Sequence, residues 1–112
     1  MSKVKRKLTT ILATDCVGFS KRMDENEELT LENLKACRSI IDPQIKEFGG
    51  RIFYTAGDSV IAEFESPVEC VNAAIGFQKA INDRNNTLSE ESQLDWRVGI
   101  HLDDVIIEGD NV

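Results

Sequence analysis

The stretch from Lys7 to Ser20 constrains the fold most, because it joins a buried-strand pattern to a polar turn. Its apolar, β-branched run from Leu8 to Ala13 predicts a central strand. Asp15 stands at the end of this strand, and a turn around Gly18 follows. A carboxylate beside free backbone N–H groups is suited to hold a metal ion and phosphates. An ordinary strand ending has the same pattern, so both interpretations stay open at this point.

The next segment has the spacing of a helix. Asp24 or Asn26 is suited to cap it, and apolar residues then recur at intervals of three and four from Leu29 to Phe48. Pro43 interrupts this spacing, so we expect a kink or a break beside it. The two glycines at positions 49 and 50 end the helix.

Two short strands and a second helix are predicted next. Residues 51–55 and 59–64 have strand patterns, and Ala56-Gly57-Asp58 forms a tight connection between them. Ser66 followed by Pro67 is typical of a helix start, and we expect this helix to end near Asn82. One face of the helix is expected to be buried: Val71, Ala74, Ile75, the stem of Gln78, and Ile81.

The last third of the chain alternates between apolar and polar residues. This alternation, from Leu94 to His101, predicts a strand with one buried face. A turn at residues 103–104 and a fifth strand at 105–108 are expected after it. The order is that of an α+β, ferredoxin-like split βαβ sandwich (βαββαβ), with an antiparallel sheet, helices on one face and this extra strand. The first and third strands are then neighbours, which brings Asp15 and Asp58 to one edge.

Charge and composition narrow the class of protein. The 112 residues suffice for one domain, and a net charge of −7 argues against nucleic-acid binding, which needs a basic surface. The sequence has no run long enough to span a membrane and no signal-peptide pattern. Three widely spaced cysteines favour reduced thiols in the cytoplasm. Residues 1–7 are expected to form a basic N-terminal tail before a single domain at 8–112.

The predicted meeting of Asp15 and Asp58 suggests a site for two divalent cations on a triphosphate. Magnesium prefers a few carboxylates, with phosphate oxygens and water completing its shell. Two such ions can activate an attacking oxygen and neutralise a leaving group. The alternative is that the two aspartates are unrelated turn residues, Asp58 being an ordinary hairpin partner of Gly57. Spacing alone leaves both possibilities open.

Three motifs, in order along the chain, resemble those of one known family. Residues 15–20 (DCVGFS) resemble the first metal-binding motif of class III adenylate/guanylate cyclases, and residues 55–58 (TAGD) resemble the second. Residues 96–101 (WRVGIH) resemble the later Arg-x-Gly-Ile-His strand of that family. The resemblance extends from Arg6 to Val112 and is to the bacterial type.

This resemblance implies roles for individual residues. Asp15 and Asp58 would be the catalytic carboxylates that bind two Mg²⁺ or Mn²⁺ ions, with the carbonyl of Cys16 as a further ligand. Arg97 would contact the β- and γ-phosphates of ATP or GTP. The ribose 3′-hydroxyl would attack the α-phosphorus in line and expel pyrophosphate. Family active sites lie between two subunits, which implies a homodimer. Backbone amides of the turn would wrap the phosphates: Val17, Gly18, Phe19 and Ser20.

Two departures from the family pattern concern substrate choice and activity. Tyr54 replaces the lysine of members with standard base recognition, and Asn111 falls near the second base-selecting position, which is often aspartate. The sequence therefore does not choose between ATP and GTP. The family's transition-state asparagine and arginine lie in a helix after the last strand. We therefore expect the natural protein to continue past Val112, and the chain alone to have little or no cyclase activity.

A nucleotide cyclase catalytic domain, incomplete at its C-terminus, is thus the leading interpretation. One alternative is a catalytically degenerate module for regulation or dimerisation, which Tyr54 favours and the retention of both Asp15 and Asp58 disfavours. A ferredoxin-like nucleic-acid-binding module is a further alternative. The acidic charge and the lack of exposed aromatic residues on the central strands argue against it.

Overall fold

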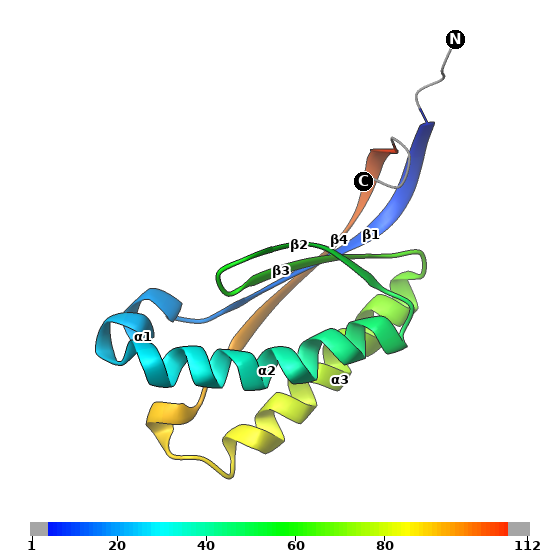
Figure 1. Cartoon of the computed structure of the whole chain (residues 1–112). Helices are drawn as coiled ribbons and strands as arrows, with labels where there is room; N and C mark the ends of the chain where they lie inside the picture. Colours follow the sequence, from blue (N-terminus) through cyan, green and yellow to red (C-terminus); the bar gives the residue numbers. More distant parts are fainter. Residues whose placement is uncertain (1–4, 108–112) are drawn as a thin grey trace.

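The computed structural model of the chain describes residues 5–107, with the backbone alone for residues 5–7 and 105–107. Across this range an antiparallel sheet has helices α2 and α3 packed on one face (Figure 1). The predicted α+β, ferredoxin-like class is confirmed. The elements are β1 (Lys5–Cys16), α1 (Phe19–Glu25), α2 (Glu27–Glu47), β2 (Arg51–Ala56), β3 (Ser59–Phe64), α3 (Pro67–Asn85), the 3₁₀ turn η1 (Glu90–Ser92) and β4 (Trp96–Ile107).

The sheet has the strand order β2-β3-β1-β4, with β1 between β3 and β4. β1 pairs antiparallel with β3, from Thr10 opposite Phe64 to Thr14 opposite Val60. This confirms the predicted neighbourhood of the first and third strands. The strand order follows from the two crossovers through α2 and α3. Crossovers of the same, right-handed sense place both helices on one face of the sheet.

The C-terminal part of the sheet differs from the expectation. Asp103 and Asp104 form no turn, and residues 105–107 continue β4 instead of starting a fifth strand. The reason lies in β1, which begins at Lys5 and supplies a pairing partner as far as Ile107. A continuous ladder satisfies the backbone groups that a turn would leave to solvent. Residues 5–7 of the expected basic tail therefore belong to β1 instead.

Helix α2 runs unbroken through Pro43, so the expected break is absent. A proline inside a helix costs about 3 kcal/mol. Ile41 and Ile45 on either side of it are fully buried, and each gains about 1.5–3 kcal/mol from burial. Packing therefore exceeds the local cost. Of the two predicted caps, Asn26 is the one that caps the helix, since its side chain accepts a hydrogen bond from the Leu29 amide.

Helix α3 buries a different face from the one predicted. Ala74 and Ile81 are buried as expected, but Val71 and Ile75 are 44% and 60% exposed. The buried face is centred on Cys70 and Phe77, and it is completed by Ala73. Both faces carry apolar residues at helical spacing, so periodicity alone did not decide between them. None of the helices in residues 5–107 is long and apolar enough to cross a membrane.

Gly50, which follows the end of α2, offers a test of core packing. A β-carbon at this position would stand 2.5 Å from the Phe64 ring and 2.7 Å from the Ile45 side chain. We expect Gly50→Ala to lower the free energy of unfolding by about 1–3 kcal/mol, the usual cost of overpacking. Urea denaturation measures it, with Gly99→Ala as the control because nothing lies within 4 Å of that site. Equal stability of the two variants would contradict the close packing at Gly50.

Candidate active site

Asp15 and Asp58 lie at one edge of the sheet, as the topology predicted. Asp15 is near the end of β1, and Asp58 is in the tight turn between β2 and β3. The pairing of β1 with β3 brings the two together. The backbone N–H of Cys16 donates a hydrogen bond of 2.8 Å to Oδ2 of Asp58. Gly57 permits the turn because its φ of 56° is in the left-handed region that favours glycine.

Arg97 on β4 completes a cluster of three charged side chains. It stands directly opposite Asp15 in the β1–β4 register, and its Nε donates a 2.8 Å hydrogen bond to Oδ1 of Asp15. This hydrogen bond and the charge of Asp15 raise the pKa of Arg97, and the charge of Asp58 raises it further. The side chains of Arg97 and Asp15 are 69% and 39% exposed, so a ligand in solution can reach the ion pair.

An open hollow on the sheet surface adjoins this cluster. Its walls come from β1, β3 and β4, and it includes Asp15 and Arg97. Ala13 pairs with Gly99 across the two strands, and a methyl group beside a residue without a side chain leaves the space above the sheet free. The complete lining is Ala13, Thr14, Asp15, Ser59, Val60, Ile61, Arg97, Val98 and Gly99.

The turn after β1 leads directly into α1. Gly18 has φ 65° and ψ 30°, and α1 begins at the next residue. The Val17 N–H is not free, because it donates a 2.8 Å hydrogen bond to the carbonyl of Asp95. Amides in the first turn of a helix have no acceptor within that helix. Of the four amides expected to wrap phosphates, those of Gly18, Phe19 and Ser20 therefore remain candidates and that of Val17 does not.

The side chain of Cys16 points into the core, where only 2% of the residue is exposed. Burial raises the pKa of the Cys16 thiol to about 12, and the charge of Asp58 adds to the shift. Burial also raises the pKa of Cys70 to about 11. These thiols stay protonated at neutral pH, so any contribution of Cys16 to a metal site comes from its carbonyl group. The three cysteines are buried and free.

Tyr54 lies one strand away from the hollow. It is 54% exposed on β2 and pairs with Ile61, which lines the hollow. Side chains of directly paired residues share one face of a sheet. The Tyr54 ring therefore stands on the same face as the hollow, beside it. Asn111, the other predicted base-selecting residue, lies outside the described residues.

Asp15 and Asp58 suit magnesium or manganese as oxygen ligands, but two carboxylates do not complete the coordination shell of either ion. No group of three or more His, Cys, Asp or Glu side chains able to hold a metal ion occurs in the described part of the chain. Asp15 and Asp58 offer hard oxygen ligands, and each spends one oxygen on the Arg97 or Cys16 contact. Magnesium binds through few carboxylates, with substrate phosphates and water completing its shell. The pair therefore suits a metal that arrives with a phosphate ligand.

Sequence reasoning had no basis for α1 as a separate helix. Its residues, Phe19–Glu25, include only two apolar side chains, Phe19 and Met23, which are too few to establish a helical period. The weak sequence signal for it is Gly18, a residue able to adopt the left-handed conformation that precedes α1.

Comparisons with known proteins agree with the resemblance to cyclases. The chain is similar to the crystal structure of an adenylate/guanylate cyclase/hydrolase from Silicibacter pomeroyi, with a TM-score of 0.85 and 32% identity. A Rhizobium meliloti (strain 1021) protein provisionally named adenylate cyclase 3 is 36% identical over 106 residues. Nearly the whole chain is thus similar to adenylate/guanylate cyclases. No protein-family model matches it.

The chain spans only part of the length of these relatives. The similarity covers 97% of the chain but 64% of the Silicibacter structure. It covers 94% of the chain and 18% of the Rhizobium protein. A serine/threonine-protein kinase, pkn2 of Myxococcus xanthus, is 30% identical over 112 residues, which are 99% of this chain and 14% of that protein. The similarity therefore does not transfer the activity or the partners of those whole proteins to this chain.

Proposed function

We propose that this chain supplies the metal- and phosphate-binding half of a nucleotide cyclase active site. The reaction converts ATP or GTP into the 3′,5′-cyclic nucleotide and pyrophosphate. The supporting observation is the cluster of Asp15, Asp58 and Arg97 beside an open hollow. Two carboxylates and a guanidinium in contact with solvent match a triphosphate that carries divalent cations.

Asp15 and Asp58 hold the ions, with the Cys16 carbonyl as an additional ligand. Two Mg²⁺ or Mn²⁺ ions, when bound, supply the charge that activates the ribose 3′-hydroxyl and neutralises the departing pyrophosphate. Arg97 leaves Asp15 and binds the β- and γ-phosphates, for which its planar donor array is suited. The amides of residues 18–20 donate hydrogen bonds to the same phosphates.

The fold keeps these groups in position before the substrate arrives. Asp15 and Arg97 lie on two strands in direct register, and Asp58 is held by the Cys16 amide. Groups on paired strands and in a bonded turn lose little freedom on binding, which favours in-line attack by the hydroxyl on the α-phosphorus. Catalysis by this chain is therefore positioning combined with charge neutralisation.

The proposal extends to the residues that select the base and to the oligomeric state of the protein. Tyr54 stands on the face of the hollow and offers a hydroxyl that both donates and accepts hydrogen bonds, so it suits either purine base. Asn111 is proposed as the second base-selecting residue. The protein is proposed to act as a cytoplasmic homodimer with active sites between its subunits, without nucleic acid or membrane partners. The buried free thiols support a reducing compartment.

The test is turnover of ATP and GTP with Mg²⁺ or Mn²⁺, with products separated by chromatography and identified by mass spectrometry. Both the 112-residue chain and the same chain extended past Val112 are assayed, because the family resemblance assigns two catalytic side chains to the later segment. We expect the extended chain to yield a metal-dependent cyclic nucleotide that disappears in Asp15→Ala and Asp58→Ala, and the 112-residue chain to yield little or none. A folded dimer that binds nucleotide and yields no cyclic product in either form would favour the regulatory or dimerisation module.

A further inference from the structure

Helix α1 follows the Gly18 turn directly, yet it has little apolar packing of its own to anchor it. None of its residues is buried. Phe19 alone among them packs, partly buried, against the core. A short helix with so little apolar burial depends on polar contacts to keep its place. The position of the turn that precedes it depends on the same contacts.

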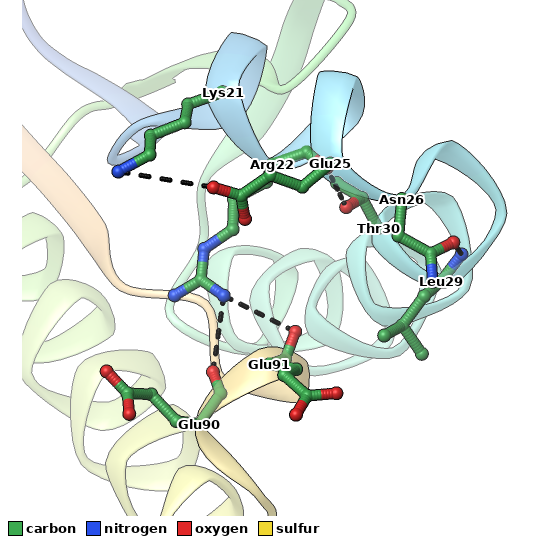
Figure 2. A pocket seen from close by; sticks show the side chains of 8 residues that line it. All are labelled: Lys21, Arg22, Glu25, Asn26, Leu29, Thr30, Glu90 and Glu91. Carbon is green, nitrogen blue, oxygen red and sulfur yellow. Dashed lines mark hydrogen bonds and ion pairs between the residues drawn. The ribbon is translucent and has the colours of Figure 1, made fainter.

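Arg22 provides these polar contacts on both its side chain and its backbone. Its Nη1 donates to the carbonyl oxygens of Glu90 and Glu91 in η1, at 3.2 Å and 3.3 Å. Figure 2 shows the side chain reaching from α1 across a pocket to η1. The Arg22 carbonyl in turn accepts a 2.9 Å hydrogen bond from Oγ1 of Thr30, a buried residue on α2. Arg22 thus ties α1 to two other elements.

The segment that receives Arg22 also holds the other side of the turn. Asp95, three residues after η1, accepts the hydrogen bond from the Val17 amide. The buried side chain of Asn85 on α3 anchors this segment: it donates to the Leu94 carbonyl at 2.9 Å and accepts from the Leu94 amide at 3.3 Å. Residues 90–95 therefore hydrogen-bond to the chain on both sides of Gly18, at Val17 before it and at Arg22 four residues after it.

We infer that Arg22 is a positioning residue for the phosphate-binding turn at Gly18–Ser20, an inference that rests on the proposed function. The guanidinium does not reach phosphate itself. Its Nη1 donates to two η1 carbonyls, in a pocket whose lining residues include Glu25, Glu90 and Glu91 (Figure 2). Its effect on phosphate binding is indirect: it holds α1, and with it the turn that precedes the helix, in place.

The test compares Arg22→Met, Arg22→Lys and Lys21→Met in the 112-residue chain. Lys21→Met removes the same charge from the same helix, and Lys21 makes only a 4.0 Å contact with Glu25. Calorimetry measures the affinity for tripolyphosphate with Mn²⁺, hydrogen exchange measures protection of amides 19–25, and urea denaturation measures global stability. Arg22→Met is expected to bind about tenfold more weakly, the loss of one to two good hydrogen bonds. Its α1 amides exchange faster without a matching loss of global stability.

Arg22→Lys keeps one donor for the η1 carbonyls and is expected to recover part of both the affinity and the protection. Lys21→Met is expected to match the wild type within about twofold, as exposed ion pairs contribute little. Unchanged α1 exchange in Arg22→Met, unchanged affinity, or an equal loss in Lys21→Met would each overturn the inference. A wild-type chain that does not bind the Mn²⁺–tripolyphosphate probe would overturn the proposed function, while α1 exchange would still decide whether Arg22 anchors the helix.

Discussion

Asp58→Asn is expected to weaken binding of ATP in the presence of Mn²⁺ on the order of 100-fold, the upper end of the loss when even an outer-shell partner is removed from a metal site. The substitution takes away one of the two carboxylates that meet at the sheet edge. An asparagine oxygen can still accept the hydrogen bond from the Cys16 amide, so the turn keeps its geometry. The loss then reports the charge of the ligand and not the fold.

Isothermal calorimetry of ATP titrated into the Mn²⁺-equilibrated chain measures this effect. The matched control is Asp83→Asn, which makes the same charge change at an exposed position on α3. We expect the control to bind ATP as the wild type does. If the two variants lose affinity equally, the effect is one of net charge and the aspartate pair does not hold metal.

Arg97→Gln is expected to change two affinities in opposite directions. In the free protein Arg97 occupies Oδ1 of Asp15, so a metal ion without nucleotide must compete with the guanidinium for that oxygen. Removing Arg97 also removes a like charge from the site. We therefore expect Mn²⁺ alone to bind more tightly by about tenfold, a size consistent with loss of a charge-assisted contact. Binding of Mn²⁺ with tripolyphosphate is expected to weaken by about tenfold, because a charge-assisted phosphate contact disappears.

The two affinities are measured at low ionic strength, since an exposed ion pair is screened by salt. Arg51→Gln is the control, because Arg51 also pairs with a carboxylate, that of Glu63 at 2.9 Å, away from the hollow. Affinities that both rise, both fall, or follow those of Arg51→Gln would show that Arg97 does not exchange between carboxylate and phosphate.

Much of the fold was predictable because its signals are local. The strand from residue 59 to 64, the cap at Ser66 and the helix stop at Gly49 each follow from a short pattern. The meeting of Asp15 and Asp58 was predictable too, since it depends on strand order and not on any detail of packing. Topology places strand ends whatever the side chains of the core.

The errors occurred where tertiary contacts outweighed local preference. Asp103-Asp104 is a turn pattern, yet the ladder with β1 keeps it extended. Pro43 is a helix breaker, yet its buried neighbours keep α2 continuous. The hydrogen bonds of Arg22 had no sequence signal at all, because their acceptors are backbone carbonyls that every residue carries.

The sequence by itself indicated which residues are proposed to bear the chemistry: the carboxylates at positions 15 and 58, and the motif around Arg97. Only the tertiary structure decided that Arg97 and Asp15 bond to each other in the free protein. That contact depends on the register of β1 against β4, in which Asp15 stands opposite Arg97. A shift of one residue would turn Arg97 to the other face of the sheet, since side chains alternate with a period of two. Register arises from the packing of the whole buried face, and no single motif specifies it.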